Sequence, residues 1–173
     1  ARVMAVRPDI IVNAAAYTSV DRAETDRETA WAVNAEGVEH LARAANRAGA
    51  VLVHVSTDYV FDGSAVEPYK PSDATAPQGV YGASKLAGER ALAEHCTRYL
   101  VLRTAWVFSE YGNNFLKTML RLGSKQSELH VVEDQFGCPT YGQDIAKAIQ
   151  VIIEKLKSEE VSSSLYHFSG NFC

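Results

Sequence analysis

The sequence predicts an α/β fold with a parallel β-sheet, and three observations support this prediction. Short apolar runs at residues 10–13, 51–55 and 99–103 have the length and the branched side chains of buried strands. Segments with helical spacing of apolar residues, 21–47 and 81–96, separate these runs. Because a helix that connects neighbouring strands brings the chain back to the same end of the sheet, the strands must run parallel.

The first elements of the chain form a β-α-β unit. Residues 1–7 have the character of the last turns of a helix that Pro8 stops, and the following strand, residues 9–13, is too apolar to be half exposed. The helix expected over residues 21–47 is closed by Gly49. Its buried stripe consists of Val38, Leu41, Ala42 and Ala45.

The second half of the chain continues this alternation after a long loop. Residues 63–79 contain three prolines and no regular apolar spacing, and loops of this length inside compact domains usually serve a function. The elements expected after the loop are a helix at 81–96, a strand at 99–103, a helix at 112–122, a strand at 129–132, a helix with the buried stripe Ile145, Ala148, Ile149, Ile152 and Leu156, and a strand at 166–168.

Tyr81 and Lys85 lie four residues apart at the start of a predicted helix, so their side chains share one face. A free tyrosine phenol has a pKa near ~10, and a cation beside it stabilises the phenolate and lowers that pKa. Tyr81 would then be a usable general acid at neutral pH. The same spacing also arises by chance on solvent-exposed helices, so the pair needs support from other motifs.

That support comes from the ends of the predicted strands, where open α/β sheets bind their ligands. Ser56 and Thr57 place two hydroxyl groups directly after the run 51–55. Trp106 follows the run 99–103 and either stacks on a sugar or a base, or fills the core. The small residues 14–16 after the first strand either admit a flat ligand close to the backbone or pack tightly against the next helix.

Composition excludes several classes of function. A net charge of −4 without a Lys/Arg cluster argues against nucleic-acid binding. The sequence has neither an apolar run of the ~20 residues that a membrane span needs nor the apolar core of a signal peptide at its start, so we expect no membrane association and a cytoplasmic protein. Three scattered cysteines and five scattered histidines predict reduced thiols and no metal site built by the protein.

Taken together, these motifs resemble the dTDP-4-dehydrorhamnose reductase family, a member of the extended short-chain dehydrogenase/reductase superfamily. The stretches that carry the resemblance are residues 13–18, 20–21, 56–63, 81–85, 103–107 and 134–140. The resemblance implies a Rossmann-like, doubly wound parallel sheet with helices on both faces. It also implies one partial NAD(P)-binding reductase domain, residues 1–173, in which residues from about 104 onward serve the substrate side. Since the sequence lacks the Gly-rich turn that opens such folds, we expect it to be the central part of a longer protein.

The resemblance also implies a role for each matching residue. The catalytic residues would be Thr57, Tyr81 and Lys85; the cofactor would contact Ala15, Ala16, Tyr17, Thr18, Tyr81 and Lys85; and the substrate would contact Thr57, Asp58 and Trp106. The implied reaction is reduction of the C4 carbonyl of dTDP-4-dehydro-L-rhamnose by NADPH or NADH, with a dTDP-sugar as the partner. Two alternatives stay open: a nucleotide-sugar epimerase or dehydratase, and a non-catalytic binding subunit similar to the regulatory subunit of methionine adenosyltransferase.

One expectation concerns the first strand, Ile10 to Asn13. If the part of the fold that precedes it in the usual strand order 3-2-1-4-5-6 is missing, this strand becomes an edge of the sheet. It is apolar and contains neither lysine nor proline, the residues that discourage edge-to-edge pairing. We therefore expect self-association through this edge.

Overall fold

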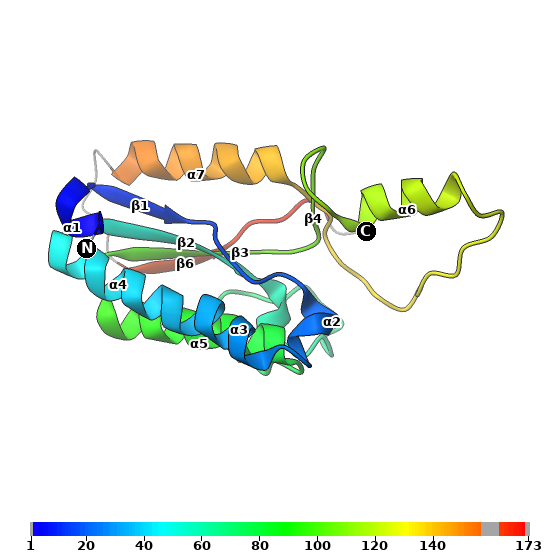
Figure 1. Ribbon diagram of the computed structural model, residues 1–173, viewed down its shortest axis with the longest axis horizontal. Helices are drawn as coiled ribbons and strands as arrows, with labels where there is room; N and C mark the ends of the chain where they lie inside the picture. Colours follow the sequence, from blue (N-terminus) through cyan, green and yellow to red (C-terminus); the bar gives the residue numbers. More distant parts are fainter. Residues whose placement is uncertain (1, 157–162, 172–173) are drawn as a thin grey trace.

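The computed structural model describes residues 2–156 and 163–171 and contains a parallel sheet at its centre. The strand order is β1 (Ile10–Asn13), β2 (Val51–Thr57), β3 (Tyr99–Thr104) and β6 (Ser164–His167), and every neighbouring pair is parallel (Figure 1). The predicted α/β class and its three main strands are confirmed. The terminal strand begins two residues earlier and ends one residue earlier than predicted.

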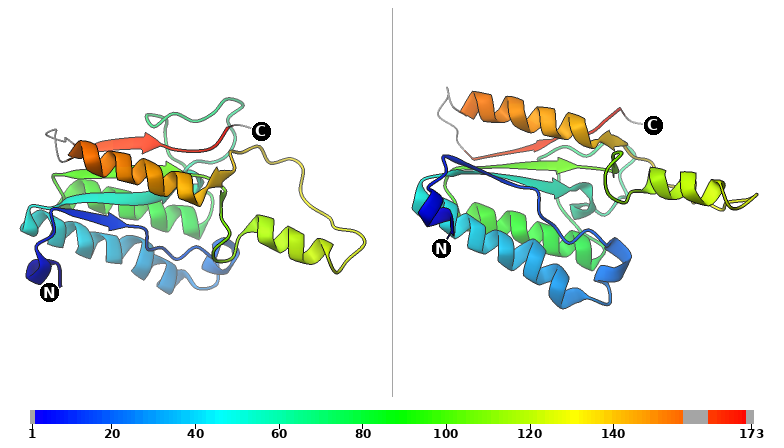
Figure 2. Two further views of the ribbon diagram at one scale, coloured as in Figure 1. Left: turned by 90° about the horizontal axis from the view of Figure 1, so that it is seen from above. Right: turned by 45° about the horizontal axis from the view of Figure 1, so that its top comes forward.

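Helices cover both faces of this sheet, as a doubly wound fold requires. Helices α4 (Gly37–Ala48) and α5 (Val80–His95) lie on one face, and α7 (Gly142–Leu156) lies on the other (Figures 1 and 2). Because successive side chains of a strand point to opposite faces, β2 divides its residues between two cores. Leu52 packs with α4 and α5, while Val51 and Val53 pack with α7.

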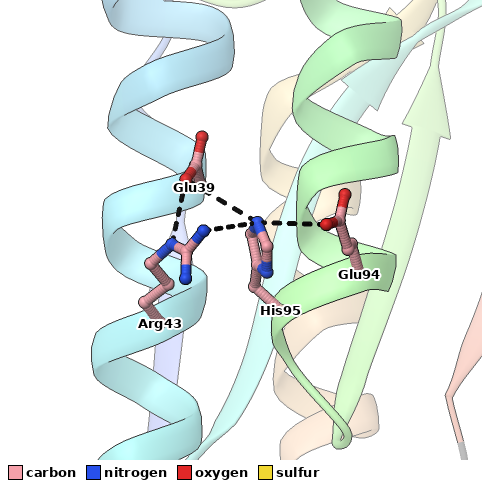
Figure 3. Close-up of polar contacts among 4 residues, drawn as sticks. All are labelled: Glu39, Arg43, Glu94 and His95. Carbon is pink, nitrogen blue, oxygen red and sulfur yellow. Dashed lines mark hydrogen bonds and ion pairs between the residues drawn. The ribbon is translucent and has the colours of Figure 1, made fainter.

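The neighbouring helices α4 and α5 are also joined at their surface. Arg43 of α4 donates from Nε to Glu39 at 2.9 Å and from Nη2 to Nε2 of His95 on α5, also at 2.9 Å (Figure 3). Glu94 lies on the other side of His95, at 3.8 Å. Exposed ion pairs of this kind contribute at most about 1 kcal/mol each, so the buried apolar stripe remains the main link between the two helices.

The prediction of a single helix over residues 21–47 is wrong, because the structure divides this range into several elements. The structure contains α2 (Val20–Ala23), α3 (Arg27–Trp31), a π-helical segment η1 (Ala32–Glu36) and then α4. The backbone leaves the helical region at Asp26, the N-cap of α3, where φ is −117°. Asp is a residue that favours helix starts over helix interiors, and the carboxylate of Asp26 also accepts a hydrogen bond from the Tyr17 hydroxyl.

Two strand predictions also need correction. Residues 129–132 form no strand: Val131 and Val132 lie exposed in an irregular segment, and no strand among the described residues pairs with them. Strand β1 was expected to be too apolar for half exposure, yet Val12 is 41% exposed. Among the described residues β1 pairs only with β2, so one of its sides stays open.

The remaining elements are short or project from the body. A one-turn helix α1 (Arg2–Val6) precedes β1, and a 3-10 turn η2 (Asp58–Val60) follows β2. Strands β4 (Val107–Phe108) and β5 (Thr140–Tyr141) form a separate parallel pair. Helix α6 (Phe115–Gly123), capped by the Asn114 side chain, extends away from the sheet with the segment after it (Figure 2).

Within the described ranges, no helix has the length and apolar character that a membrane span requires. Over the same residues, no three His, Cys, Asp or Glu side chains converge as a metal site. Cys96 and Cys138 are free thiols, and Cys173 lies outside the described residues.

Candidate active site

The candidate site lies where the carboxyl ends of β2 and β3 meet the beginning of α5. Thr57 ends β2, Thr104 ends β3 and Tyr81 is the second residue of α5. All three line a cleft of about 440 Å³, together with Lys85 and Asp58. This is the edge at which parallel α/β sheets bind ligands, so the fold brings the predicted catalytic residues to one place.

Two close contacts set the start of α5. The N–H of Val80 donates to the carboxylate of Glu24 at 2.7 Å, which satisfies one of the free donors at the helix N-terminus. Gly82 lies so close to η2 that a side chain there would overlap the Tyr59 carbonyl group. The ring of Tyr59 meets the ring of Tyr81 edge to face, with 5.5 Å between centroids. These contacts fix the start of α5, and with it the position of Tyr81.

Tyr81 is a neutral phenol in this environment. Burial raises its pKa, a hydrogen bond with the Thr57 side chain opposes the rise, and the charges of Asp58 and Tyr59 add to it. The expected lowering of this pKa by Lys85 is not found. A phenol with a raised pKa carries its proton at neutral pH, which is the form that a proton donor needs.

Lys85 explains why that expectation fails. Its Nζ donates to the backbone carbonyl of Val55 at 2.7 Å, and the side chain is only 2% exposed. Burial lowers the pKa of Lys85 to about 8, and the charge of Glu89 opposes this change. The ammonium group therefore lies deep in the cleft, directed to the strand backbone.

Asp58 and Thr57 form a hydrogen-bonded pair beside Tyr81. The Thr57 hydroxyl donates to Asp58 Oδ1 at 3.0 Å and accepts from the backbone N–H of Tyr59 at 3.2 Å. Burial raises the pKa of Asp58, and the hydrogen bond from Thr57 opposes the rise. A carboxyl group that lines the cleft can accept hydrogen bonds from hydroxyl groups of a bound ligand.

Two further hydroxyl groups in the cleft have no partner among the described residues. Ser56 Oγ and Thr104 Oγ1 are buried and unpaired, and both residues line the cleft. Buried polar atoms usually have partners, so these two keep unused hydrogen-bonding capacity, although neither oxygen is itself exposed to the cleft. Sequence reasoning had noticed Ser56 as part of a hydroxyl pair, but it assigned a role to Thr57 alone and none to Thr104. Their position at the strand ends was the signal that could have found both.

Only part of the predicted cofactor-binding segment, residues 15–18, faces the cleft. Ala16 and Thr18 line the cleft, whereas Ala15 and Tyr17 do not. The Tyr17 ring packs against the group of Ala23, Ala30 and Val80, and its hydroxyl donates to Asp26. The small residues after β1 therefore leave room for a ligand at Ala16 and Thr18, while Tyr17 anchors the segment.

Asn34, which sequence reasoning missed, fixes this segment against α5. Its side chain accepts from the Tyr17 N–H at 2.9 Å and donates to the Tyr17 carbonyl and to Ser84 Oγ, each at 3.1 Å. Asn34 lies in the π-helical segment η1 and is 1% exposed. No local sequence pattern indicates contacts across separations of 17 and 50 residues.

Trp106 lies at the exit of β3 and is 41% exposed, so it is not a core tryptophan. Its backbone has a φ of +45°, a strained conformation for a bulky residue. Its ring lies against Gly137, where an added Cβ atom would come within 2.6 Å of ring atom Cζ2. The ring borders both the first cleft and an adjoining cleft of about 980 Å³, which Tyr81, Asp58 and the loop around Tyr69 also line.

The chain is similar to known reductases along most of its length. Residues 1–172 match the family model described as "RmlD substrate binding domain". The chain is 50% identical over 165 residues to dTDP-4-dehydrorhamnose reductase from Escherichia coli strain K12, an alignment that covers 95% of this chain and 55% of that protein. This chain therefore spans a little over half the length of that relative.

Two solved structures have the same fold. A Bacillus anthracis dTDP-4-dehydrorhamnose reductase in complex with NADP matches with a TM-score of 0.88 and 44% identity, over 99% of this chain and 60% of that chain. A Clostridium acetobutylicum orthologue matches with a TM-score of 0.92 and 39% identity, over the same shares. The Rossmann-like fold expected from the sequence is confirmed by this likeness.

Proposed function

Because the chain belongs to the family of the RmlD substrate binding domain, we propose that it carries the catalytic centre of a dTDP-4-dehydrorhamnose reductase. The proposed reaction reduces the C4 keto group of dTDP-4-dehydro-L-rhamnose to give dTDP-L-rhamnose. The observation that carries the proposal is the convergence of Thr57, Asp58, Tyr81 and Lys85 on one cleft at the carboxyl ends of the strands.

In this proposal Tyr81 donates the proton to the carbonyl oxygen. The raised pKa of its phenol keeps the proton in place until negative charge develops on that oxygen. Thr57 stabilises the same oxygen by a hydrogen bond. Since its hydroxyl donates to Asp58 in this structure, it must turn toward the substrate to do so. One such preorganised donor contributes roughly 3 kcal/mol to stabilising the transition state.

The cleft also fits the nicotinamide end of a cofactor. Ala16, whose side chain is small, lines this cleft together with Ser56 and Thr104, whose buried hydroxyl groups have no partner among the described residues. NADPH or NADH, when bound, supplies the hydride that reduces the carbonyl. Lys85 would hold ribose hydroxyl groups with its ammonium group, and Thr18, which lines the same cleft, would also contact the cofactor.

We propose that the adjoining cleft is the binding site of the dTDP-sugar. Its volume of about 980 Å³ suits a nucleotide-sized ligand, and Asp58, Tyr81 and Trp106 border it where it opens into the catalytic cleft. We assign Trp106 to packing on the sugar and Asp58 to hydrogen bonding with its hydroxyl groups.

The test is NADPH oxidation in the presence of dTDP-4-dehydro-L-rhamnose, run on this chain and on a version extended to the length of the relatives. Tyr81→Phe keeps the ring but removes the proton, so turnover should collapse while cofactor affinity changes little. Tyr111→Phe is the matched control, because Tyr111 is 76% exposed and lines neither cleft. Turnover at the parent rate in Tyr81→Phe would overturn the assignment, and binding of both ligands without turnover in any version would favour a binding subunit.

We also propose that this chain self-associates through β1. That strand pairs only with β2 among the described residues, and Val12 is exposed on it. Unpaired backbone groups on an apolar edge strand can pair with the same strand of a second copy.

A further inference from the structure

A loop between η2 and α5 borders the proposed binding site of the sugar nucleotide. Residues 62–68 are exposed and irregular, but the rings of Phe61 and Tyr69, which flank them, stack with 4.2 Å between centroids. We name residues 61–69 the cleft loop, because all of them except Ser64 line the adjoining cleft of about 980 Å³. The described lining of the catalytic cleft includes none of them. Loops whose ends meet and pack through their own side chains often serve a function.

The hydroxyl group of Tyr69 closes the cleft loop. It donates to Asp62 Oδ1 at 2.5 Å and accepts from the backbone N–H of Ala65 at 3.1 Å. The same carboxylate oxygen accepts from the Ser64 hydroxyl at 2.8 Å and from the Ser64 N–H at 3.0 Å. These hydrogen bonds, that of Tyr69 first, lower the pKa of Asp62 to about 2, so the acceptor is ionised at neutral pH. Because hydrogen bonds to an ionised acceptor are stronger than those between neutral groups, the Tyr69 hydroxyl is a strong link within the loop.

The ends of the cleft loop are fixed to the body of the protein. Phe61 is 6% exposed and packs with Leu86 of α5. The guanidinium group of Arg103 on β3 lies over its ring, 5.1 Å from the centroid. The backbone carbonyl oxygen of Tyr69 lies 3.0 Å from Nδ1 of His167 on β6, and because a carbonyl oxygen only accepts, this nitrogen is the donor. With its ends anchored, the loop owes the shape of its exposed middle to the hydrogen bonds around the Tyr69 hydroxyl.

We propose that Tyr69 is a positioning residue for the sugar nucleotide, because its hydroxyl group keeps the cleft loop closed as a wall of the adjoining cleft. The inference rests on the proposed function, which assigns that cleft to the dTDP-sugar. If only a fraction of the molecules hold the loop closed, the apparent Kd of a ligand that needs the closed wall rises by the inverse of that fraction. Tyr69 therefore sets affinity, whereas the chemistry stays with the catalytic cleft.

The first test removes the Tyr69 hydroxyl group and keeps the ring that stacks on Phe61. If the loop in Tyr69→Phe is closed in about one molecule in ten, the Kd of dTDP-L-rhamnose in calorimetry and the KM of the keto sugar nucleotide should rise about tenfold. The kcat at saturating sugar and the Kd of NADPH should match the parent, since the loop contributes nothing to the described lining of the catalytic cleft. Unchanged Kd and KM values for the sugar nucleotide would overturn the proposal, and so would an equal loss of NADPH affinity.

Tyr141→Phe is the matched control. The Tyr141 hydroxyl also donates to a carboxylate, that of Glu110 at 3.0 Å, and neither residue is among the described residues that line the two clefts. This variant should bind both ligands and turn over like the parent. The same loss of affinity in Tyr141→Phe as in Tyr69→Phe would show a general effect of losing a surface tyrosine hydroxyl and would overturn the proposal.

A double variant tests whether the bond between Tyr69 and Asp62 is the cause. Asp62→Ala removes the acceptor instead of the donor, and it should also raise the Kd of dTDP-L-rhamnose. In Asp62→Ala/Tyr69→Phe the Kd should be no higher than in the weaker-binding single variant, because each change breaks the same bond. A Kd raised by the product of the two single effects would mean that the residues act independently, and the bond would not be the cause.

Amide hydrogen exchange separates a failure of this inference from a failure of the proposed function, because it needs no ligand. The Ala65 amide, which donates to the Tyr69 hydroxyl, should exchange faster in Tyr69→Phe and at the parent rate in Tyr141→Phe. Unchanged exchange in Tyr69→Phe, or faster exchange with unchanged binding of the sugar nucleotide, refutes the role of Tyr69 alone. A parent that binds the sugar nucleotide without turnover refutes the reductase reaction, and weaker binding in Tyr69→Phe still supports the role of Tyr69. A parent that binds no dTDP-sugar, at this or the extended length, refutes both.

Discussion

Gly82 should be the most sensitive small residue next to the candidate site. In Gly82→Ala the new Cβ would lie 3.0 Å from the Tyr59 carbonyl carbon, still closer to the carbonyl oxygen, and 3.1 Å from Pro77 Cβ. Real Cβ atoms do not approach backbone this closely, so α5 and η2 must move apart. Tyr81, the preceding residue, would move with the helix.

The structure sets the expected size of this effect. Overpacking against backbone atoms costs about 1 to 3 kcal/mol. The better helix propensity of alanine stabilises α5 by less than ~1 kcal/mol. We therefore expect a net loss of stability of about 2 kcal/mol. A displacement of Tyr81 by about 1 Å would also reduce turnover on the order of 100-fold.

Urea denaturation and the NADPH oxidation assay measure the two effects separately. Gly123→Ala is the control, because Gly123 ends the exposed helix α6 and a Cβ there would meet only Leu129 Cδ1, at 3.9 Å. It should leave stability unchanged or raise it slightly. If Gly82→Ala unfolds at the same urea concentration as the parent and keeps its turnover, the close packing of α5 on η2 does not constrain the site.

Three other predictions address the lysine, the tryptophan and the edge strand. Because the folded pKa of Lys85 is about 8, below its unfolded value, the chain should gain about 2 kcal/mol of stability between about pH 7.5 and about pH 9.5. Lys85→Met should lack this gain. If the free energy of unfolding, measured by chemical denaturation at each pH, rises equally with pH in the parent and in Lys85→Met, the prediction is wrong. Trp106→Ala should weaken dTDP-sugar binding in calorimetry, and so should Gly137→Ala, whose new Cβ would displace the Trp106 ring; unchanged sugar binding in Trp106→Ala would refute the role of this ring. Val12→Lys should reduce self-association in light scattering, whereas Val66→Lys, at a loop position that is 93% exposed, should not; a parent that is monomeric at all concentrations would refute the edge contact.

Local sequence patterns predicted most of the architecture because they report burial along a single element. The apolar runs identified β1, β2 and β3, and the spacing of Ile145, Ile149 and Leu156 identified α7. The same logic failed at residues 129–132, whose β-forming side chains pair with no strand in the part of the chain that the structure describes. Propensity alone does not supply a hydrogen-bonding partner for a strand.

The sequence by itself determined the parallel sheet, the hydroxyl groups at its strand ends and the four-residue spacing of Tyr81 and Lys85. Tertiary structure alone decided where those groups point. Lys85 bonds to a strand carbonyl 30 residues away, Asn34 joins Tyr17 to Ser84, and Glu24 caps α5 across 56 residues. Each of these contacts joins elements that the topology brings together. Periodicity describes one helix or strand at a time, so it cannot indicate which polar group meets which across the layers of the fold.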